Sequence, residues 1–502
     1  MTRMKHFRIP FTLFYSLFTL LFGVAVFLFF GMAYPHHLHY QEQYQLFLFD
    51  SNYAWDVVRL PGGVADLLGR FCTQFFLFAW VGAAIIALLL TAVQLLTLRL
   101  VSAWGSKAVA PGAKASNTAG RPAWGWFYGL SFVPSFLLWL FLLDENALLG
   151  GAWAVLLTQL AVWLVALLRK GWMRLVAMPV AIFVLYWIAF GGSHYHRYPT
   201  VFPTLLYAAW LSAIVLPLVV LACQRWISTS HFSSLTSHLH FSFPFLISHF
   251  SFLILLFSLV WTNANFKAEK VMKYDFMARY QQWNRILETI NAEKPNNQIG
   301  VTVQNLALAM RGMLVDRLFD YHQNGTAGLL PDVERDATSP LPTAEAFYQL
   351  GMITVAQRTV FEAQEAILDF QKSARCYKRL AETNLILGSY EVARKYLLAL
   401  RKTLFYRDWA NETLPLLGNE KAIAAHPEYG HLRQWACKED YYFSDHVTPE
   451  MLESLYFSRS TSDSLQSKTT DNLLALEYLK AYYMLTGDRE SYTKLLLHLQ
   501  KP

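Results

Sequence analysis

The sequence predicts an all-α protein in two parts: an N-terminal bundle of about seven transmembrane helices, followed by a helical-repeat soluble domain. Three observations predict it. Hydrophobic residues make up 55% of the 502 residues and charged residues only 15%, against about 25% in typical soluble proteins. The apolar runs gather in the first half, and the second half carries apolar residues at helical spacing. This composition excludes a disordered chain, a collagen-like fibre and a small disulfide scaffold.

The charge balance divides the chain near residue 262. Residues 1–262 hold 14 Lys and Arg against 6 Asp and Glu, whereas residues 263–502 hold 28 against 29. The basic residues of the first half lie between apolar runs, while a nucleic-acid-binding protein gathers them on one folded surface. We therefore expect a polytopic membrane domain at 1–262, a helical repeat-like domain at 263–502, the lipid bilayer as a partner and no nucleic-acid partner.

Seven apolar runs qualify or nearly qualify as membrane spans, because a bilayer core of about 30 Å needs roughly 20 helical residues. The third and fifth runs are short, and Pro244 and His249 interrupt the seventh. The predicted spans are residues 11–33, 74–98, 126–143, 147–168, 175–190, 201–223 and 241–261.

The loops between these runs predict their orientation. Eleven Lys and Arg precede the first run or follow the second, fourth and sixth, against three in the alternate loops. The positive-inside rule therefore places the N-terminus in the cytoplasm. Seven spans put residues 263–502 outside the cytoplasm and six put them inside. We expect seven, in a multi-pass protein of the plasma (inner) membrane.

The loop at 34–72 is expected to be an ordered outer loop. Tyr40–Phe49 has the mixed composition of an interfacial amphipathic helix, and Pro61-Gly62-Gly63 indicates a turn. One interpretation of the loop's charges is that they are solvated or paired at the headgroups. The other makes two aspartates catalytic toward a lipid-linked substrate, within a candidate binding loop. The catalytic candidates are Asp56 and Asp66, and the binding candidates are Arg59, Pro61, Gly62, Gly63 and Arg70.

The run QEQYQLFLFDSNYAWDVVRLPGGVADLLGRFCTQFF, at Gln41–Phe76, resembles a family of uncharacterised polytopic membrane proteins of Bacteroidota. The resemblance implies N-terminal spans followed by a helical extracytoplasmic domain. It implies no activity.

Three stretches of the second half share the offsets 0, 3, 4, 7, 16, 20 and 23, which describe two facing helices. They begin at Phe347, Tyr377 and Leu476. The pattern looks like the tetratricopeptide repeat. It departs from that repeat because the first two units begin 30 residues apart rather than 34, and because Lys480 replaces a small residue. A plain helical bundle has the same spacing and stays an alternative. Thr343 is the predicted N-cap of the first helix.

Motifs of common enzyme classes are missing from the sequence. It has no Gly-rich phosphate loop, no His-Glu-x-x-His, no nucleophile elbow and no paired Cys motif. Cys376 and Cys437 share the exported half, and whether they pair stays open. The histidine groups lack Cys or carboxylate at ligand spacing, so we predict no metal and no cofactor. These groups are His36, His37 and His39, then His194 and His196, then His231, His238 and His240.

Three function classes follow from these patterns, and one of them is disfavoured. The first is a non-enzymatic anchor that presents the 263–502 domain to a protein or envelope component, since stacked helix pairs leave an extended face for partners. The alternative is a membrane-embedded glycosyl- or lipid-group transferase that acts through Asp56 and Asp66 of the outer loop. A transporter is the third class, and it is disfavoured because the spans hold almost no ionisable groups.

Overall fold

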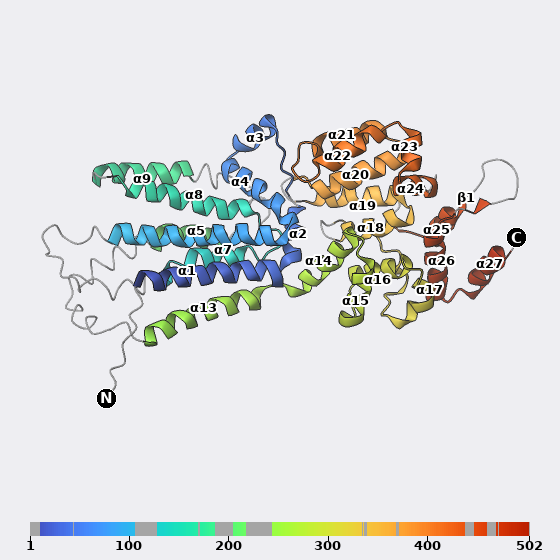
Figure 1. The fold of residues 1–502 in the computed structure, drawn as a ribbon, viewed down its shortest axis with the longest axis horizontal. Coiled ribbons are helices and arrows are strands. Elements are labelled where there is room, and N and C mark those ends of the chain that lie inside the picture. Colours follow the sequence, from blue (N-terminus) through green and yellow to red (C-terminus); the bar gives the residue numbers. More distant parts are fainter. Residues whose placement is uncertain are drawn as a thin grey trace. The chain divides into compact units, whose positions relative to one another are not determined.

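Across the residues that it describes, the computed structural model is helical apart from one two-stranded ribbon, in which β1 (Phe457–Ser458) pairs antiparallel with β2 (Lys468–Thr469). The chain forms two compact units. Unit 1 comprises Met1–Glu42 and Asp50–Phe266, and unit 2 comprises Gln43–Phe49 and Lys267–Pro502 (Figure 1). The structure describes residues 11–43, 45–105, 128–168, 171–185, 204–216, 243–333, 335, 339–367, 371–436, 446–458, 468–469 and 471–500.

Unit 1 is a bundle of apolar helices with a short polar hairpin. The long helix α5 packs against α1, α7 and α8, while α8 also packs against α4 and α9. Its labelled helices are α1 (Phe11–Leu28), α2 (Pro35–Glu42), α3 (Ser51–Val58), α4 (Gly63–Thr73), α5 (Ala79–Gly105), α7 (Val133–Phe141), α8 (Leu149–Ala166), α9 (Gly171–Leu185) and α13 (Phe243–Asn263), with a π-helical turn at Phe29–Ala33 and a 3₁₀ turn at Gln74–Leu77.

Among the described residues, fewer helices meet the length and apolarity of a membrane span than the seven that the sequence predicts. Ser16–Ala33 and Ala79–Val101 meet both criteria, and a third candidate arises if α13 and the next helix are counted as one broken span. Other predicted spans form shorter apolar helices, at Tyr128–Phe141, Leu149–Val165 and Thr204–Leu216. The predicted spans at 175–190 and 201–223 extend partly outside the described residues.

Neutral polar side chains link the apolar helices of unit 1. The Gln94 amide on α5 donates to Ser131 Oγ at 2.8 Å, and Thr19 Oγ1 on α1 donates to Gln94 Oε1 at 3.2 Å. One turn further along α5, Gln159 of α8 donates to Thr97 Oγ1 at 2.7 Å. All five side chains are buried. Uncharged hydrogen bonds of this kind hold apolar helices together where hydrophobic burial alone does not select one packing.

Unit 2 is built from short helices joined by tight turns. Its helices are α14 (Phe266–Arg279), α15 (Trp283–Glu293), α16 (Gln298–Ala309), α17 (Leu314–Arg317), α18 (Pro340–Leu350), α19 (Ile353–Ala366), α20 (Ala374–Leu387), α21 (Tyr390–Leu400), α22 (Arg407–Thr413), α23 (Glu420–Ala425), α24 (Tyr429–Trp435), α25 (Pro449–Tyr456), α26 (Leu473–Thr486) and α27 (Arg489–Leu499). Short 3₁₀ turns lie at Leu318–Asp320, Gly325–Gly328 and Leu414–Leu416.

Helices α18 to α21 stack in chain order, because α18 packs on α19, α19 on α20, and α20 on α21. Each of the three helix pairs that the sequence indicates turns at a glycine with positive φ: Gly351, Gly388 and Gly487. Glycine adopts this conformation without the penalty that a Cβ brings. The third pair, α26 and α27, does not continue the stack, since α26 packs instead on α25, α17 and α16.

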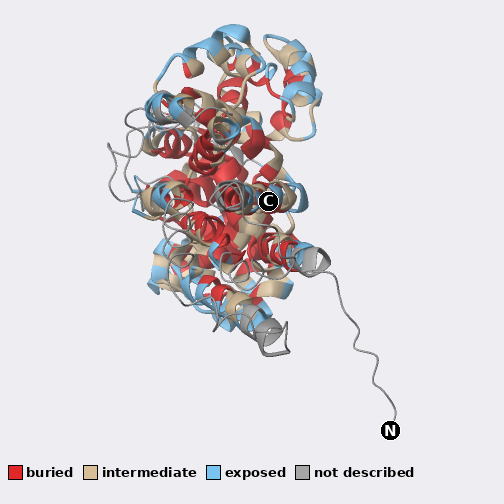
Figure 2. Cartoon of the chain, turned by 90° about the vertical axis from the view of Figure 1, so that its left-hand side faces the viewer, coloured by how far each residue is buried: buried red, intermediate tan, exposed pale blue. Residues whose placement is uncertain are grey.

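The core of unit 2 runs through both parts of this arrangement. Phe347, Leu385 and Leu479 are buried in one hydrophobic cluster that joins α18, α20 and α26. Figure 2 shows buried residues on the inner sides of the helices and exposed residues on their outer sides. Leu329 and Leu330, in the segment before α18, belong to the same core cluster.

One predicted helix start is wrong. Thr343 is not the N-cap of α18, because the helix begins at Pro340 and the Thr343 hydroxyl donates to Ser339 O at 2.9 Å. Proline is favoured at the first helical position, since the N–H that it lacks has no intrahelical partner there.

Residues Gln43–Phe49, here called the strap, belong to unit 2 although the chain on both sides of them belongs to unit 1. Leu46 N donates to Lys372 O and Phe49 N to Lys402 O, both at 2.7 Å. The predicted amphipathic helix over Tyr40–Phe49 is therefore wrong beyond Glu42, where α2 ends. The backbone N–H groups of the strap bond to another part of the chain, and this replaces the helical hydrogen bonds.

Candidate functional site

The predicted outer loop forms a helical hairpin, α3 and α4, whose turn residues are structural. The Asp50 carboxylate caps α3 by accepting from Asn52 N at 2.9 Å and from Tyr53 N at 3.2 Å. Gly62 has a φ of 78°, and a Cβ on Gly63 would lie 1.9 Å from Val57 O. The Gly62-Gly63 pair is therefore required by the backbone path of the turn.

The two candidate catalytic aspartates each have a neighbouring arginine. Asp56 pairs with Arg59 at 3.1 Å, and both side chains are about 60% exposed. Asp66 accepts from Arg70 Nε at 2.9 Å and Nη2 at 2.6 Å, with both side chains close to 10% exposed. Arg70 Nη1 also donates to the Tyr53 hydroxyl at 3.4 Å, so the buried pair ties α4 to α3.

Helix α4 is packed closely on the bundle of unit 1. A Cβ on Gly69 would lie 2.5 Å from Gly150 N of α8, so the two backbones are nearly in contact at this crossing. The predicted loop residues are thus brought into one hairpin that is fixed to α8. Asp66 and Arg70 lie on its buried side, while Asp56 and Arg59 lie on its exposed side.

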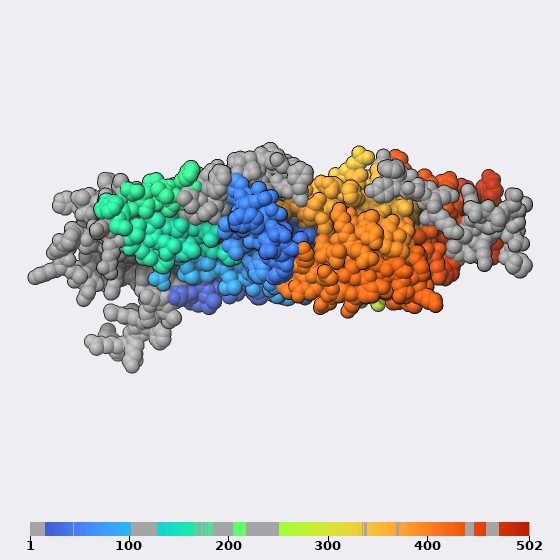
Figure 3. All heavy atoms as spheres, turned by 90° about the horizontal axis from the view of Figure 1, so that it is seen from above, coloured from blue at the N-terminus to red at the C-terminus, as the bar shows by residue number. Residues whose placement is uncertain are grey.

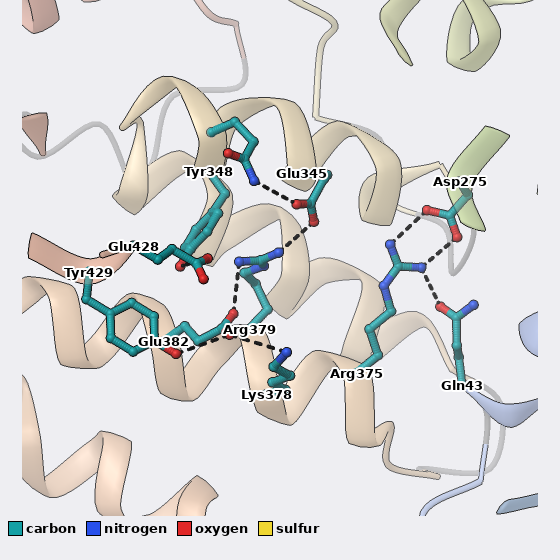
Figure 4. A network of polar contacts seen from close by, with 11 residues as sticks. Gln43, Asp275, Glu345, Tyr348, Arg375, Lys378, Arg379, Glu382, Glu428 and Tyr429 are labelled. Atoms are coloured by element: carbon teal, nitrogen blue, oxygen red, sulfur yellow. Dashed lines mark hydrogen bonds and ion pairs between the residues drawn. The ribbon is translucent and has the colours of Figure 1, made fainter. Parts of the chain in front are cut away.

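A second set of charged side chains, not predicted from the sequence, is buried in unit 2 (Figure 4). Arg379 of α20 donates through Nη2 to Glu345 Oε2 of α18 at 2.6 Å, and its Nη1 lies 2.8 Å from Glu382 Oε2. Its guanidinium stacks on the Tyr348 ring, 3.6 Å from the centroid. Burial disfavours the charged guanidinium, but the carboxylates of Glu345 and Glu382 outweigh this and raise the pKa of Arg379.

Helix α24 and the residue before it, Glu428, complete this network of polar contacts. The Tyr348 hydroxyl donates to Glu428 Oε1 at 3.0 Å, and the Tyr429 hydroxyl to Glu382 Oε1 at 3.5 Å. Burial raises the pKa of Glu382 even though Arg379 opposes the rise. Burial and the surrounding carboxylates likewise raise the pKa of Tyr348. The segment 428–435 therefore fills the space beside α18 and α20 that a stack of helix pairs can leave to a partner.

Another buried arginine, Arg375, joins the strap to the rest of unit 2. Arg375, at the start of α20, forms a bidentate ion pair with Asp275 of α14 at 2.6 and 2.8 Å. Its Nη1 also donates to the strap residue Gln43 at 2.9 Å (Figure 4). Both charged side chains are about nine-tenths buried. Arg375 thus connects three segments that lie far apart in the sequence.

Each of these buried carboxylates is engaged with an arginine, a tyrosine or both, and these contacts fix its position. A sequence signal for them exists: Arg375, Arg379 and Glu382 follow one another at helical spacing of four and three residues. A solvent-exposed helix face carries the same pattern, so the sequence alone does not distinguish a buried charge network from an exposed one.

No metal site emerges in the part of the chain that the structure describes, where no group of three or more His, Cys, Asp or Glu could hold an ion. His37 instead contacts Leu142 O at 3.0 Å through Nε2. The groups at His194 and His196 and at His231, His238 and His240 lie outside the described residues, as does Cys437. The pairing of Cys376 with Cys437 therefore stays open.

Comparison with known protein families gives a match that extends over nearly the whole chain. Its sequence matches a family of unknown function, DUF6057, over residues 10–501. The chain belongs to this family. No curated protein and no solved structure matches the chain. The match extends over residues of both units and assigns them no activity.

Proposed function

We propose that this chain is an integral membrane protein whose apolar helices anchor unit 2 outside the cytoplasm, where unit 2 binds an anionic protein or envelope component without catalysis. The membrane placement is supported by the apolar helices α1 and α5 and by the neutral hydrogen bonds that link α5 to α1 and to α8. The cytoplasmic N-terminus follows from the loop charges.

The count of crossings and the repeat class belong to the same proposal. We propose seven crossings, with the shorter apolar helices completing the bundle. The stacked pairs α18–α19 and α20–α21, each turning at a positive-φ glycine, support a degenerate tetratricopeptide-like repeat. Such stacks expose an extended surface on which partners bind.

The observation that carries the binding proposal is the basic outer face of α21 and the turn that follows it. Residues 391–412 hold five Lys or Arg and three Asp or Glu, whereas residues 263–502 as a whole are nearly balanced. The exposed members include Arg394, Lys395, Arg401 and Arg407, and the three acidic residues are exposed as well, so the face carries a net charge of +2 (five basic minus three acidic residues). Arg394 pairs with one of the acidic residues, Glu391, at 3.5 Å. In the space-filling view of Figure 3 the residues near 400 (orange) form one continuous outer surface. A face of this sign attracts acidic partners.

The inner face of the same stack is a weaker candidate for a partner, because α24 already covers it through Glu428 and Tyr429. Catalysis by the outer loop is not proposed either. No geometry there favours it, since Asp56 and Asp66 each pair with an arginine on their own helix or its adjoining turn.

The test reverses charges on the full-length protein in membranes. The variant Arg394→Glu/Lys395→Glu/Arg401→Glu is compared with a control, Arg489→Glu/Lys494→Glu, on the exposed side of α27. Binding is measured to polyglutamate and to a phosphorylated glycan. We expect at least tenfold weaker binding for the α21 variant, wild-type binding for the control, and a decline with salt. Equal binding by all three proteins would contradict the proposal.

A further inference from the structure

The strap occupies a built site in unit 2. It lies across the end of the α20–α21 pair that is opposite the Gly388 turn, since it bonds to Lys372 O just before α20 and to Lys402 O just after α21. Leu46 is buried in a cluster with Ala381, Leu397 and Leu400 of these helices. The strap therefore completes a hydrophobic core rather than resting on a surface.

The polar end of the strap is held equally firmly. Gln43 accepts from Arg375, whose guanidinium is fixed by both oxygens of the buried Asp275. A charged group that is nine-tenths buried is costly to leave without its partners, so this end of the strap has a defined position. Backbone hydrogen bonds, an apolar anchor and a charge-assisted bond all fix the same seven residues.

From this we infer that the strap and residues 267–500 lie on the same side of the membrane, and that residues 50–266 therefore cross it an even number of times. The inference rests on the proposed membrane placement and goes beyond it. Seven extended residues span at most about 25 Å, less than the bilayer core of about 30 Å. The strap cannot bond to unit 2 through the membrane, so both occupy one compartment.

The even number decides between the topologies that the sequence leaves open. One crossing precedes the strap in either topology. A protein with six crossings would therefore have five between the strap and unit 2, an odd number, and this topology is excluded. A protein with seven crossings would have six there, an even number, and this topology is allowed. On the stricter criterion of length and apolarity, α5 alone would be a single crossing after the strap, so α13 must return the chain. In both counts α13 crosses, and the N-terminus lies opposite unit 2.

The test labels single cysteines in a full-length protein that lacks the native cysteines. A maleimide that cannot cross the inner membrane is added to cells whose outer barrier has been made permeable and whose inner membrane is intact. Asn52→Cys, exposed at the start of α3, reports the side of the hairpin, and Lys494→Cys on α27 reports unit 2. Ala115→Cys, between α5 and α7, is the reference for the opposite side. We expect Asn52→Cys and Lys494→Cys to be labelled and Ala115→Cys to be labelled only after lysis.

Labelling of Asn52→Cys and Lys494→Cys from opposite sides would overturn the inference. A separate variant, Leu46→Asp, tests docking of the strap without reference to sidedness. We expect it to speed tryptic cleavage of unit 2 at least fivefold relative to Glu490→Asp on α27, and unchanged cleavage would also overturn the inference. Membrane placement itself is tested by carbonate extraction of the wild-type protein. Extraction into the soluble fraction with strap docking intact would reject the proposed placement and leave the docking site standing.

Discussion

At the scale of single residues, burial separates charges that the sequence cannot tell apart. Asp56 and Asp66 are both followed by an arginine within one helical turn, and both were candidates for catalysis. The Asp56–Arg59 pair is about 60% exposed, whereas the Asp66–Arg70 pair is close to 10% exposed and also contacts Tyr53. An exposed pair contributes little to stability, while removal of one partner of a buried pair leaves an uncompensated charge.

Asp66→Asn is therefore expected to destabilise unit 1, by about 1–3 kcal/mol, because Arg70 loses its charged acceptor. Asp56→Asn, on the same hairpin, is expected to change stability by less than about 0.5 kcal/mol. Thermal unfolding in detergent measures both. A transferase that uses both aspartates would instead lose function in both variants with little change in stability.

Arg375→Ala is expected to destabilise unit 2 by about 3–5 kcal/mol, because it strands the buried Asp275 and releases Gln43 of the strap. The exposed pair Lys494–Glu490 provides the control, since its side chains are 71% and 78% exposed. Lys494→Ala should unfold like the wild type. Chemical denaturation followed by tryptophan fluorescence measures both, and equal midpoints would contradict the role given to Arg375.

At Tyr478 we expect a substitution to leave the free energy of unfolding equal or to raise it, whereas Asp66→Asn and Arg375→Ala are expected to lower it. The Tyr478 hydroxyl is fully buried and has no hydrogen-bond partner among the described residues, and burial raises its pKa above the ordinary value of about 10. Tyr478→Phe removes a buried unsatisfied group, so we expect equal or higher stability at neutral pH, by up to about 1 kcal/mol.

The same variant should also resist alkali better. A raised pKa in the folded state means that the phenol binds its proton more tightly when folded, so stability falls as pH rises above about 10. Tyr478→Phe lacks this loss. The free energies of unfolding of the two proteins should diverge above pH 10 in a series from pH 8 to 11, and a constant difference across this range would contradict the raised pKa of Tyr478.

At the scale of elements, apolar spacing predicts the helix pairs but not the segments that lock them together. The offsets from Phe347 and Tyr377 place the facing helices of α18–α19 and α20–α21, because a buried helix face has a fixed period. Apolar spacing does not predict the strap or α24. The strap binds through backbone N–H groups, which every residue has, and α24 is too short for a helical period.

The turns between paired helices are the elements that the sequence indicates most sharply. Gly388 has a φ of 84° and no backbone atom near the position of a Cβ, so Gly388→Ala introduces backbone strain without a clash. We expect it to destabilise unit 2 by about 1–2 kcal/mol. Ser389→Ala, the adjacent position at a φ of −82°, should be close to neutral. A thermal unfolding series compares them, and equal effects would contradict a conformational origin.

At the scale of the whole molecule, the chain is not two consecutive domains. Composition and charge predict a boundary near residue 262, and they carry no information about a seven-residue segment that leaves unit 1 and returns to it. This segment lies in the loop that was singled out for its resemblance to a membrane-protein family. Its distinctive sequence therefore has a structural explanation, since Gln43 and Leu46 are contacts of unit 2 and Asp50 caps α3.

The strap is an integral part of unit 2, and the even number of membrane crossings depends on this in the folded, full-length protein. Hydrogen exchange of that protein in detergent or nanodiscs tests this directly, with the peptide 45–50 compared with the exposed loop residues Asn296 and Asn297. We expect the amides of Leu46 and Phe49, which donate to Lys372 O and Lys402 O, to be protected at least a hundredfold relative to those of Asn296 and Asn297. Exchange of the 45–50 peptide as fast as that of the exposed loop would contradict the docking of the strap in unit 2.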